Sequence, residues 1–204
     1  MARTNEKDKR TLEIILITRK LIEEKGYDDL EMSDIAKAVG VKKSTLYYYF
    51  KNKKDLFLKT IEYDFLELKN LIQDRIKSKT TPSDKLKTMV TVFVEYFYSN
   101  KNSILIFMRN QFSCIKVNDV IDYWDTEISK AYSKFVDFME ENVKAAQKIN
   151  FLNSKVNSRV LTYSLLGLLT SVVIYRLYSE RDPKGRRETI NEILNIITKG
   201  YIKK

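Results

Sequence analysis

Histidine is absent from this chain of 204 residues, and cysteine occurs only once, at Cys114. Histidine is the commonest general acid–base residue and metal ligand at neutral pH, so its absence argues against most enzymes and metal centres. The single thiol cannot form an internal disulfide, and its neighbour Ser113 supplies no base to activate it. A glycine-rich phosphate loop is also missing. We therefore expect no catalytic residue, no metal and no cofactor, with carboxylate-only catalysis as the remaining enzymatic alternative.

Chain breakers are equally scarce, since only 5 glycines and 2 prolines occur. Hydrophobic residues make up 44% and charged residues 31% of the chain, a balance typical of globular proteins rather than of disordered ones. Few breakers between long segments with apolar residues at helical spacing predict an all-α fold.

Long hydrophobic runs are missing as well. The longest apolar stretch without charge is 160–175, which is short of the ~20 residues of a membrane span. Charged residues interrupt residues 1–20, so no secretory signal is predicted there. We expect a cytoplasmic protein without a membrane partner.

Positive charge is what the chain has in excess, with a formal net charge of +10. Within 41–54 there are five lysines and no acidic residue, whereas six acidic residues lie within 23–34. Such a focus of positive charge indicates an acidic partner, either nucleic acid or an anionic membrane surface. The lysines stand at a turn and at helix ends, not along one face of a long amphipathic helix, which favours nucleic acid.

Three short helices are predicted around this segment. Apolar spacing indicates a helix over about 12–25 that ends at Gly26, a second over 34–39 that ends at Gly40, and a third over 44–50. Glycine at position 40 permits the left-handed backbone of a sharp helix-to-helix turn. Leu46 and Phe50 lie one turn apart and would dock the third helix onto the other two. The residues predicted to point away are Ser44, Thr45, Tyr47 and Tyr48.

The run from Asp34 to Leu56 resembles the N-terminal domain of the TetR family of bacterial regulators. The pattern D-I-A-x-x-x-G-V, the segment T-L-Y-x-x-F and the start K-N-K-x-x-L of the next helix occur together at the family spacing. The resemblance covers about residues 10–60. It implies a three-helix helix-turn-helix domain over 1–55 and a larger helical ligand-binding and dimerisation domain over 56–204.

The resemblance also implies roles for individual residues at a double-stranded DNA operator. Thr45, Tyr47 and Tyr48 would reach bases or the adjacent backbone, in keeping with hydroxyls and rings that can touch base edges in the major groove. Phosphate contacts would come from Lys43, Ser44, Tyr49 and Lys53. The family often has threonine where this chain has Glu31, whose carboxylate would repel phosphate. Ser33 is therefore predicted to take over the helix cap and to belong to the DNA-binding set.

The larger part of the chain is predicted to hold further helices from Lys53, from Pro82 or Ser83 in a first turn, over 123–147, over 155–179 and over about 190–201, with shorter pieces within 101–121. Family resemblance implies a small-molecule effector here. Aromatic residues are dense in the middle helices, which predicts an apolar pocket, although such residues more often form a core. Glu95 could pair with a cationic effector or face solvent. The predicted pocket residues are Phe93, Tyr96, Phe97, Phe107, Phe112, Trp124, Tyr132 and Phe135.

The last two predicted helices carry strong apolar faces and a line of small residues, Ser164, Gly167 and Ser171, that would let another helix approach closely. Two such helices at the end of a chain favour a four-helix interface with a second copy, so a homodimer through residues 155–203 is predicted. The resemblance implies a ligand-responsive regulator, most often a repressor. The alternative is a DNA-binding adaptor of the same fold without a small-molecule effector.

Overall fold

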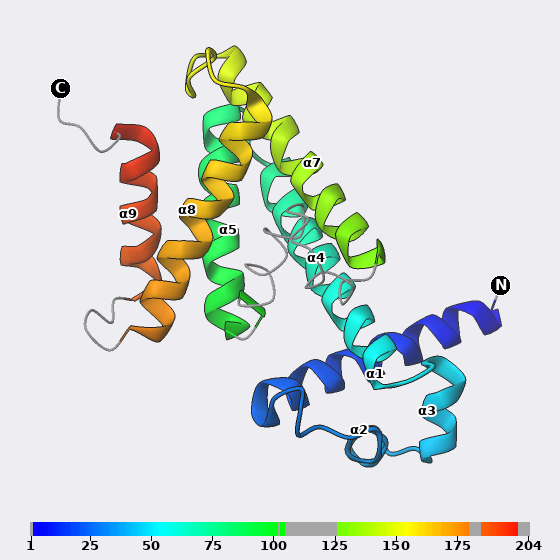
Figure 1. Cartoon of the computed structure of the whole chain (residues 1–204). Coiled ribbons are helices and arrows are strands. Elements are labelled where there is room, and N and C mark those ends of the chain that lie inside the picture. The colour runs from blue at the N-terminus through cyan, green and yellow to red at the C-terminus, as the bar shows by residue number, and fades with distance from the viewer. Residues whose placement is uncertain (1, 102, 105–125, 180–184, 200–204) are drawn as a thin grey trace, which may run out of the picture. The chain divides into compact units, whose positions relative to one another are not determined.

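The computed structural model describes residues 2–101, 103–104, 126–179 and 185–199, with side chains from residue 6 and, after the gap at 105–125, from residue 130. Within these ranges the chain forms eight α-helices and no strand, which confirms the all-α prediction (Figure 1). The helices are α1 (Ala2–Lys25), α2 (Met32–Val39), α3 (Lys43–Tyr49), α4 (Lys53–Lys77), α5 (Pro82–Ser99), α7 (Thr126–Lys148), α8 (Ser158–Tyr178) and α9 (Arg186–Lys199). The segment predicted as shorter helical pieces lies almost wholly outside the described residues.

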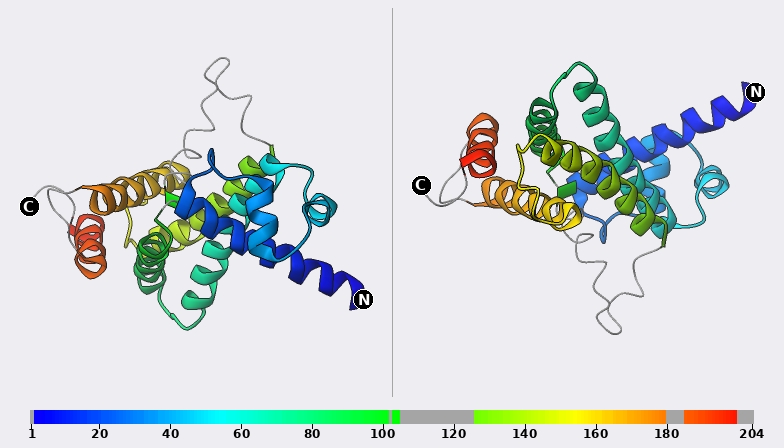
Figure 2. Two further views of the ribbon diagram at one scale, coloured as in Figure 1. Left: turned by 90° about the horizontal axis from the view of Figure 1, so that it is seen from below. Right: turned by 90° about the horizontal axis from the view of Figure 1, so that it is seen from above.

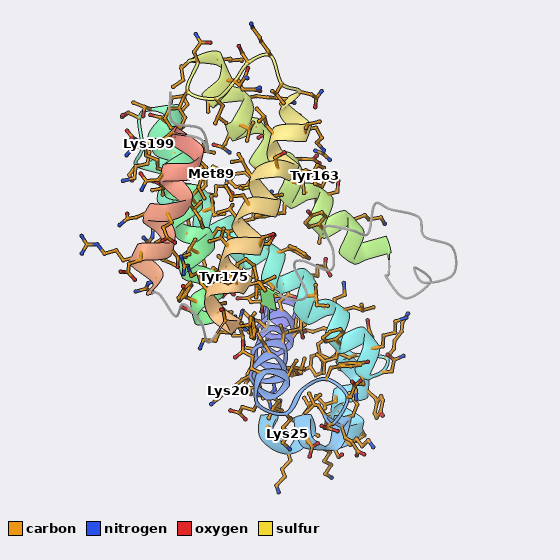
Figure 3. The ribbon with its side chains drawn as sticks, turned by 60° about the vertical axis from the view of Figure 1, so that its left-hand side comes forward. Lys20, Lys25, Met89, Tyr163, Tyr175 and Lys199 are labelled. Atoms are coloured by element: carbon orange, nitrogen blue, oxygen red, sulfur yellow. The ribbon has the colours of Figure 1, made fainter. Side chains whose placement is uncertain are left out.

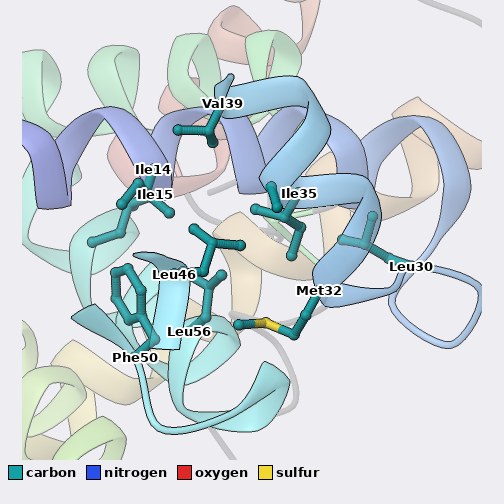
Figure 4. Packing of buried hydrophobic residues seen from close by; sticks show 10 residues of the cluster. Ile14, Ile15, Leu30, Met32, Ile35, Val39, Leu46, Phe50 and Leu56 are labelled. Atoms are coloured by element: carbon teal, nitrogen blue, oxygen red, sulfur yellow. The ribbon is translucent and has the colours of Figure 1, made fainter. Parts of the chain in front are cut away.

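The chain divides into two compact units, Met1–Asp64 and Phe65–Lys204, so the division falls inside α4. The domain boundary predicted after residue 55 stays a prediction. In the first unit, α1, α2, α3 and the start of α4 enclose one apolar core (Figure 4). This core consists of Ile14, Ile15, Leu30, Met32, Ile35, Ala36, Val39, Leu46, Phe50 and Leu56.

Two glycines end helices in the first unit as predicted. Gly26 follows α1 with φ of 82°, and its N–H donates to the Ile22 carbonyl at 2.9 Å. Gly40 follows α2 with φ of 74° and ψ of 33°, and the N–H of Val41 reaches back to the Ala36 carbonyl at 2.9 Å. This is the hydrogen-bond pattern of a Schellman ending, and it fixes the direction in which the chain enters α3.

Replacing Gly40 by alanine should destabilise the first unit by about 1–2 kcal/mol, because a Cβ at this left-handed backbone is strained. A Cβ would meet no other atom within 4 Å, so the cost is conformational rather than steric. Asparagine tolerates the same backbone better and serves as the control. Denaturant unfolding should rank the proteins as wild type, Gly40→Asn and Gly40→Ala in falling stability. Equal stability of all three would show that the left-handed turn is not required.

In the second unit, α5 packs against α7, α8 and α9 (Figures 1 and 2). Its buried side chains lie nearly all round the helix, as its sequence predicts. They are Leu86, Met89, Val90, Val92, Phe93, Val94, Tyr96 and Phe97. Pro82 occupies the first turn of α5, and the Thr81 hydroxyl caps it by accepting from the Asp84 N–H at 3.1 Å. The predicted start of this helix is confirmed.

Helix α8 is held to its neighbours by ionic contacts at both ends. At its start the Ser158 hydroxyl and Arg159 Nη1 donate to the two oxygens of Glu140 on α7, at 2.6 and 2.9 Å. These hydrogen bonds, with that of Lys144, lower the pKa of Glu140 to about 2. At its end Arg176 Nη2 donates to Glu192 Oε2 of α9 at 2.5 Å. The helix is therefore built into the bundle.

Among the described residues, α8 is the one helix long and apolar enough to cross a membrane by length and composition. It is longer than the uncharged stretch 160–175 considered from the sequence, because it includes residues on both sides of that stretch. Only 28% of its apolar window is buried within the chain. Its contacts with α5, α7 and α9 identify it as a bundle helix with one open side.

The apolar side chains of α8 are buried to different extents. Leu161, Leu165, Leu168 and Val172 are half-buried. The fully buried positions are Thr162, Leu166, Leu169, Thr170 and Val173. Since α8 is apolar nearly all round, periodicity alone gives no unique direction for its core-facing side.

Candidate nucleic-acid interface

Helix α3 presents a polar and aromatic face to solvent, as predicted. Its Leu46 is completely buried in the core of the first unit, and Phe50, which follows the helix, is also buried (Figure 4). Between these anchors the Tyr47 and Tyr48 side chains are 48% and 70% exposed. The other exposed residues of the helix are Lys43, Ser44 and Thr45. Thus five of the predicted DNA-binding residues lie together on one short helix, with their side chains accessible.

Tyr49 differs from its two neighbours. It is half-buried and packs against the core of the first unit, and the ring of Tyr48 meets it edge-on at a centroid distance of 5.2 Å. The packing of Tyr49 supports the more exposed ring of Tyr48. Its predicted role as a phosphate contact stays a prediction.

The turn between α3 and α4 is fixed by a reciprocal cap. The Asn52 side-chain oxygen accepts from the Asp55 N–H at 2.8 Å, and Asp55 Oδ2 accepts from the Lys51 N–H at 2.8 Å. Leu56, directly after this cap, is completely buried. The cap and this anchor together hold the first turn of α4, and with it Lys53, beside α3.

Lys53 is positioned by the loop between α1 and α2. Its ammonium group donates to the Asp28 carbonyl at 3.1 Å and lies 4.5 Å from the centroid of the Tyr27 ring. Tyr27 in turn contacts the ring of Phe57 at 4.4 Å. Sequence reasoning identified Lys53 but missed Tyr27 and Asp28, which are distant in the chain. The sequence carries no local signal for such a contact.

The start of α2 corrects one prediction. Ser33 does not cap the helix, because α2 already begins at Met32, whose side chain is drawn into the core. Glu31 is the N-cap residue, and its N–H donates to Asp34 Oδ2 at 3.1 Å. Ser33 lies exposed in the first turn and donates its hydroxyl to Glu31 Oε2 at 3.0 Å. The Glu31 carboxylate is therefore engaged within the helix start.

Two acidic residues of the first unit, one before α3 and one after it, are paired with basic side chains within the unit. Lys25 lies 3.7 Å from Asp34, and Arg19 forms a half-buried ion pair of 3.0 Å with Asp64 on α4. Around α3 itself, Lys42, Lys43, Lys51 and Lys54 are exposed. The positive charge expected from the sequence thus borders the tyrosine-bearing face.

Known bacterial regulators resemble this chain in sequence. Residues 14–60 match the model of the family described as bacterial regulatory proteins, tetR family. The chain is 25% identical over 201 residues to the HTH-type transcriptional regulator QacR of Staphylococcus aureus, covering 98% of this chain and 100% of that protein. It is also 25% identical over 143 residues to the fatty acid metabolism regulator protein of Bacillus subtilis, covering 70% and 72% of the two chains.

These comparisons support a TetR-family transcriptional regulator. The likeness extends over both units in the solved structure of the transcriptional regulator FadR from Bacillus subtilis in complex with stearoyl-CoA. That structure matches with a TM-score of 0.76 at 19% identity and covers 94% of this chain and 99% of its own. The protein is a helix-turn-helix transcription regulator, and the expectation that it is not an enzyme is confirmed by its relatives.

In a TetR-family protein the larger unit is where an effector is expected, and there the structure brings several predicted aromatic residues together. Phe93, Tyr96 and Phe97 of α5 are buried, with the Phe97 centroid 4.7 Å from Phe93 and 5.2 Å from Tyr96. Tyr132 and Phe135 of α7 are buried too. The other three predicted pocket residues, Phe107, Phe112 and Trp124, lie outside the described residues.

Helix α4 adds residues to this cluster that the sequence analysis did not select. The ring of Phe65 lies 5.6 Å from Tyr132 and 6.4 Å from Phe135. The Tyr96 hydroxyl donates to Glu67 Oε2 at 3.1 Å. Glu95, considered for a cationic effector, is partly exposed and lies 4.0 Å from Arg75. The ring of α4 thus packs against buried rings of α7, and α5 contributes a second group of buried rings, whereas Glu95 is partly exposed.

Proposed function

We propose that this protein is a ligand-responsive repressor that binds a palindromic DNA operator as a homodimer and releases it when a small apolar or aromatic molecule binds. The main support for DNA binding in this proposal is the exposed face of α3. Two exposed tyrosines and two hydroxyl side chains stand on a helix anchored by the buried Leu46. Exposed aromatic residues on a rigid scaffold bordered by lysines fit contact with bases and phosphates.

The proposed contacts divide into two sets. Thr45, Tyr47 and Tyr48 reach base edges or thymine methyl groups in the major groove, since they project from the exposed side of α3. The remaining residues hold the phosphate backbone from the edges of that surface. They are Ser33, Lys43, Ser44, Tyr49 and Lys53. Lys53 suits this role because its ammonium is already held near the start of α4, where the helix dipole also favours an anion.

The dimer is proposed to form through residues 155–203, chiefly through α8 and α9, which pack against each other. The open side of α8 carries exposed residues at helical spacing, with small side chains in the middle and large ones toward the ends. They are Val160, Ser164, Ser171, Tyr175 and Tyr178 (Figure 3 labels Tyr175). A Cβ on Gly167, between the two serines, would meet no atom within 4 Å. The chain's own packing does not require these small residues, whereas a second helix approaching closely does.

The effector is proposed to bind among the aromatic rings of α4, α5 and α7. An acyl chain is the first chemical class to test, because the similar FadR was crystallised with stearoyl-CoA and the rings provide an apolar interior. The partly exposed Glu95 gives less support to a cationic effector. Effector binding lowers the affinity for the operator, and operator binding lowers the affinity for the effector, if the effector favours a separation of the two α3 helices that does not match the half-sites.

Addition of stearoyl-CoA tests this proposal, with free coenzyme A as the matched control that lacks the acyl chain. At a hundred-fold excess over its Kd, the acyl compound should raise Tm by about 5–10 °C. It should also release a bound operator duplex in a gel-shift assay, whereas coenzyme A should do neither. Broader screening of apolar, aromatic and cationic compounds extends the test. Tight operator binding that no compound alters would favour the adaptor without an effector.

A further inference from the structure

The first turns of α1 lie outside the apolar core yet run close to α3. Among the side chains of α1 that the structure describes, which begin at residue 6, Ile14 is the first that is fully buried, and residues 6–9 are exposed. In Figure 1 this end of the helix passes above α3 and continues toward the N-terminus. Since residues 6–9 bury no apolar face in the first unit, packing of their side chains gives no reason for the position of this part of α1 beside α3.

One face of α1 changes from apolar to basic as it leaves the core. Ile14, Arg10 and Lys7 follow one another at spacings of four and three residues, so they share a face. Ile14 is completely buried, and Arg10 extends to the Val39 carbonyl at 3.5 Å, at the end of α2. Lys7 continues this face, and its ammonium lies 5.0 Å from the centroid of the Tyr48 ring.

We propose that Lys7 is a phosphate contact of the DNA-binding surface, carried by α1 beside the recognition helix α3. The Tyr48 side chain is 70% exposed, more than any other large hydrophobic side chain that the structure describes, so the lysine above it is accessible from the same side. A lysine ammonium has three donors on a flexible stem, and its attraction to an exposed ring is weak enough to leave donors for a phosphate oxygen. The inference rests on the proposed binding of duplex DNA by α3.

A contact between Lys7 and the DNA phosphate backbone predicts a specific change in the salt dependence of DNA binding. Each phosphate neutralised contributes about 0.9 to the slope of log Kobs against log salt concentration. Loss of Lys7 from both protomers of a dimer should therefore reduce the slope by about 1.8. The loss should affect operator and mixed-sequence duplexes alike, because phosphates carry no base identity.

The test compares Lys7→Gln with Lys9→Gln. Both variants lose one charge from an exposed lysine at the same end of α1, but residue 9 is ~200° around the helix and faces away from α3. Binding is measured from low to high salt on a palindrome selected from random duplexes and on a mixed-sequence duplex. Lys7→Gln should flatten the slope and weaken binding several-fold, Lys7→Arg should restore both, and Lys9→Gln should stay near wild type.

Equal slopes for Lys7→Gln and Lys9→Gln would overturn the proposal. An unchanged Tm of both variants, which is expected for exposed side chains, would show that a change in DNA binding does not come from a folding defect. Failure of the wild-type protein to bind either duplex would instead contradict the proposed function itself, so the two failures are distinguishable.

Discussion

Replacing Tyr47 and Tyr48 together by alanine should lower affinity for the selected operator by about a hundredfold or more, since each base contact supports ~1–3 kcal/mol of discrimination. Affinity for mixed-sequence duplex DNA should change much less, because the lysines that hold phosphates remain. Both side chains are exposed, so Tm should stay close to that of the wild type. Competition binding with specific and mixed-sequence duplexes directly measures the ratio of the affinity for the operator to the affinity for mixed-sequence DNA.

Two controls assign that effect to the tyrosines. Lys53→Gln should weaken binding to both duplexes by a similar factor, because it removes a phosphate contact and not a base contact. The double variant to phenylalanine keeps the rings and removes the hydroxyls, so it separates ring contacts from hydrogen bonds. An alanine double variant with undiminished discrimination would mean that α3 does not read the sequence.

Replacing Ser171 by arginine should convert the dimer to a monomer and reduce operator affinity by ~100-fold or more, because two linked reading units gain about that factor from bivalent binding. Ser171 is exposed on the open side of α8, where a long charged side chain would separate two closely packed helices. Sedimentation at micromolar concentration, followed by gel shift with the operator, measures both effects.

Ser133→Arg is the matched control for this variant. Ser133 is an exposed serine on α7 in the same unit, outside the proposed interface, so the same chemical change there should leave a dimer with full affinity. If Ser171→Arg remained dimeric and bound the operator normally, the second copy would have to pack elsewhere.

The helix-turn-helix could be predicted because its signals are local. Gly40 sets the turn from its own backbone, and Leu46 and Phe50 define the buried side of α3 by their spacing alone. The failure at Ser33 has a local cause too. A serine two residues after Glu31 resembles a cap in sequence, but the burial of Met32 starts the helix two residues earlier.

Contacts between distant segments could not be predicted. The positions of Lys7 over Tyr48 and of Lys53 over Tyr27 depend on how α1 crosses the other helices, and no spacing within the chain encodes them. The same limit applies to the aromatic cluster. The sequence analysis did not select Phe65 for the pocket, yet its ring contacts two of the predicted pocket residues.

Binding of a symmetric operator by the exposed face of α3 is tested most directly by selecting bound sequences from a pool of random duplexes. The structure and the family predict enrichment of a palindrome whose half-sites are separated by about one helical turn, ~34 Å, or a multiple of it. The same selection with the Tyr47→Ala and Tyr48→Ala double variant should enrich no sequence. A wild-type pool that stays random, or an enriched site without twofold symmetry, would contradict the account.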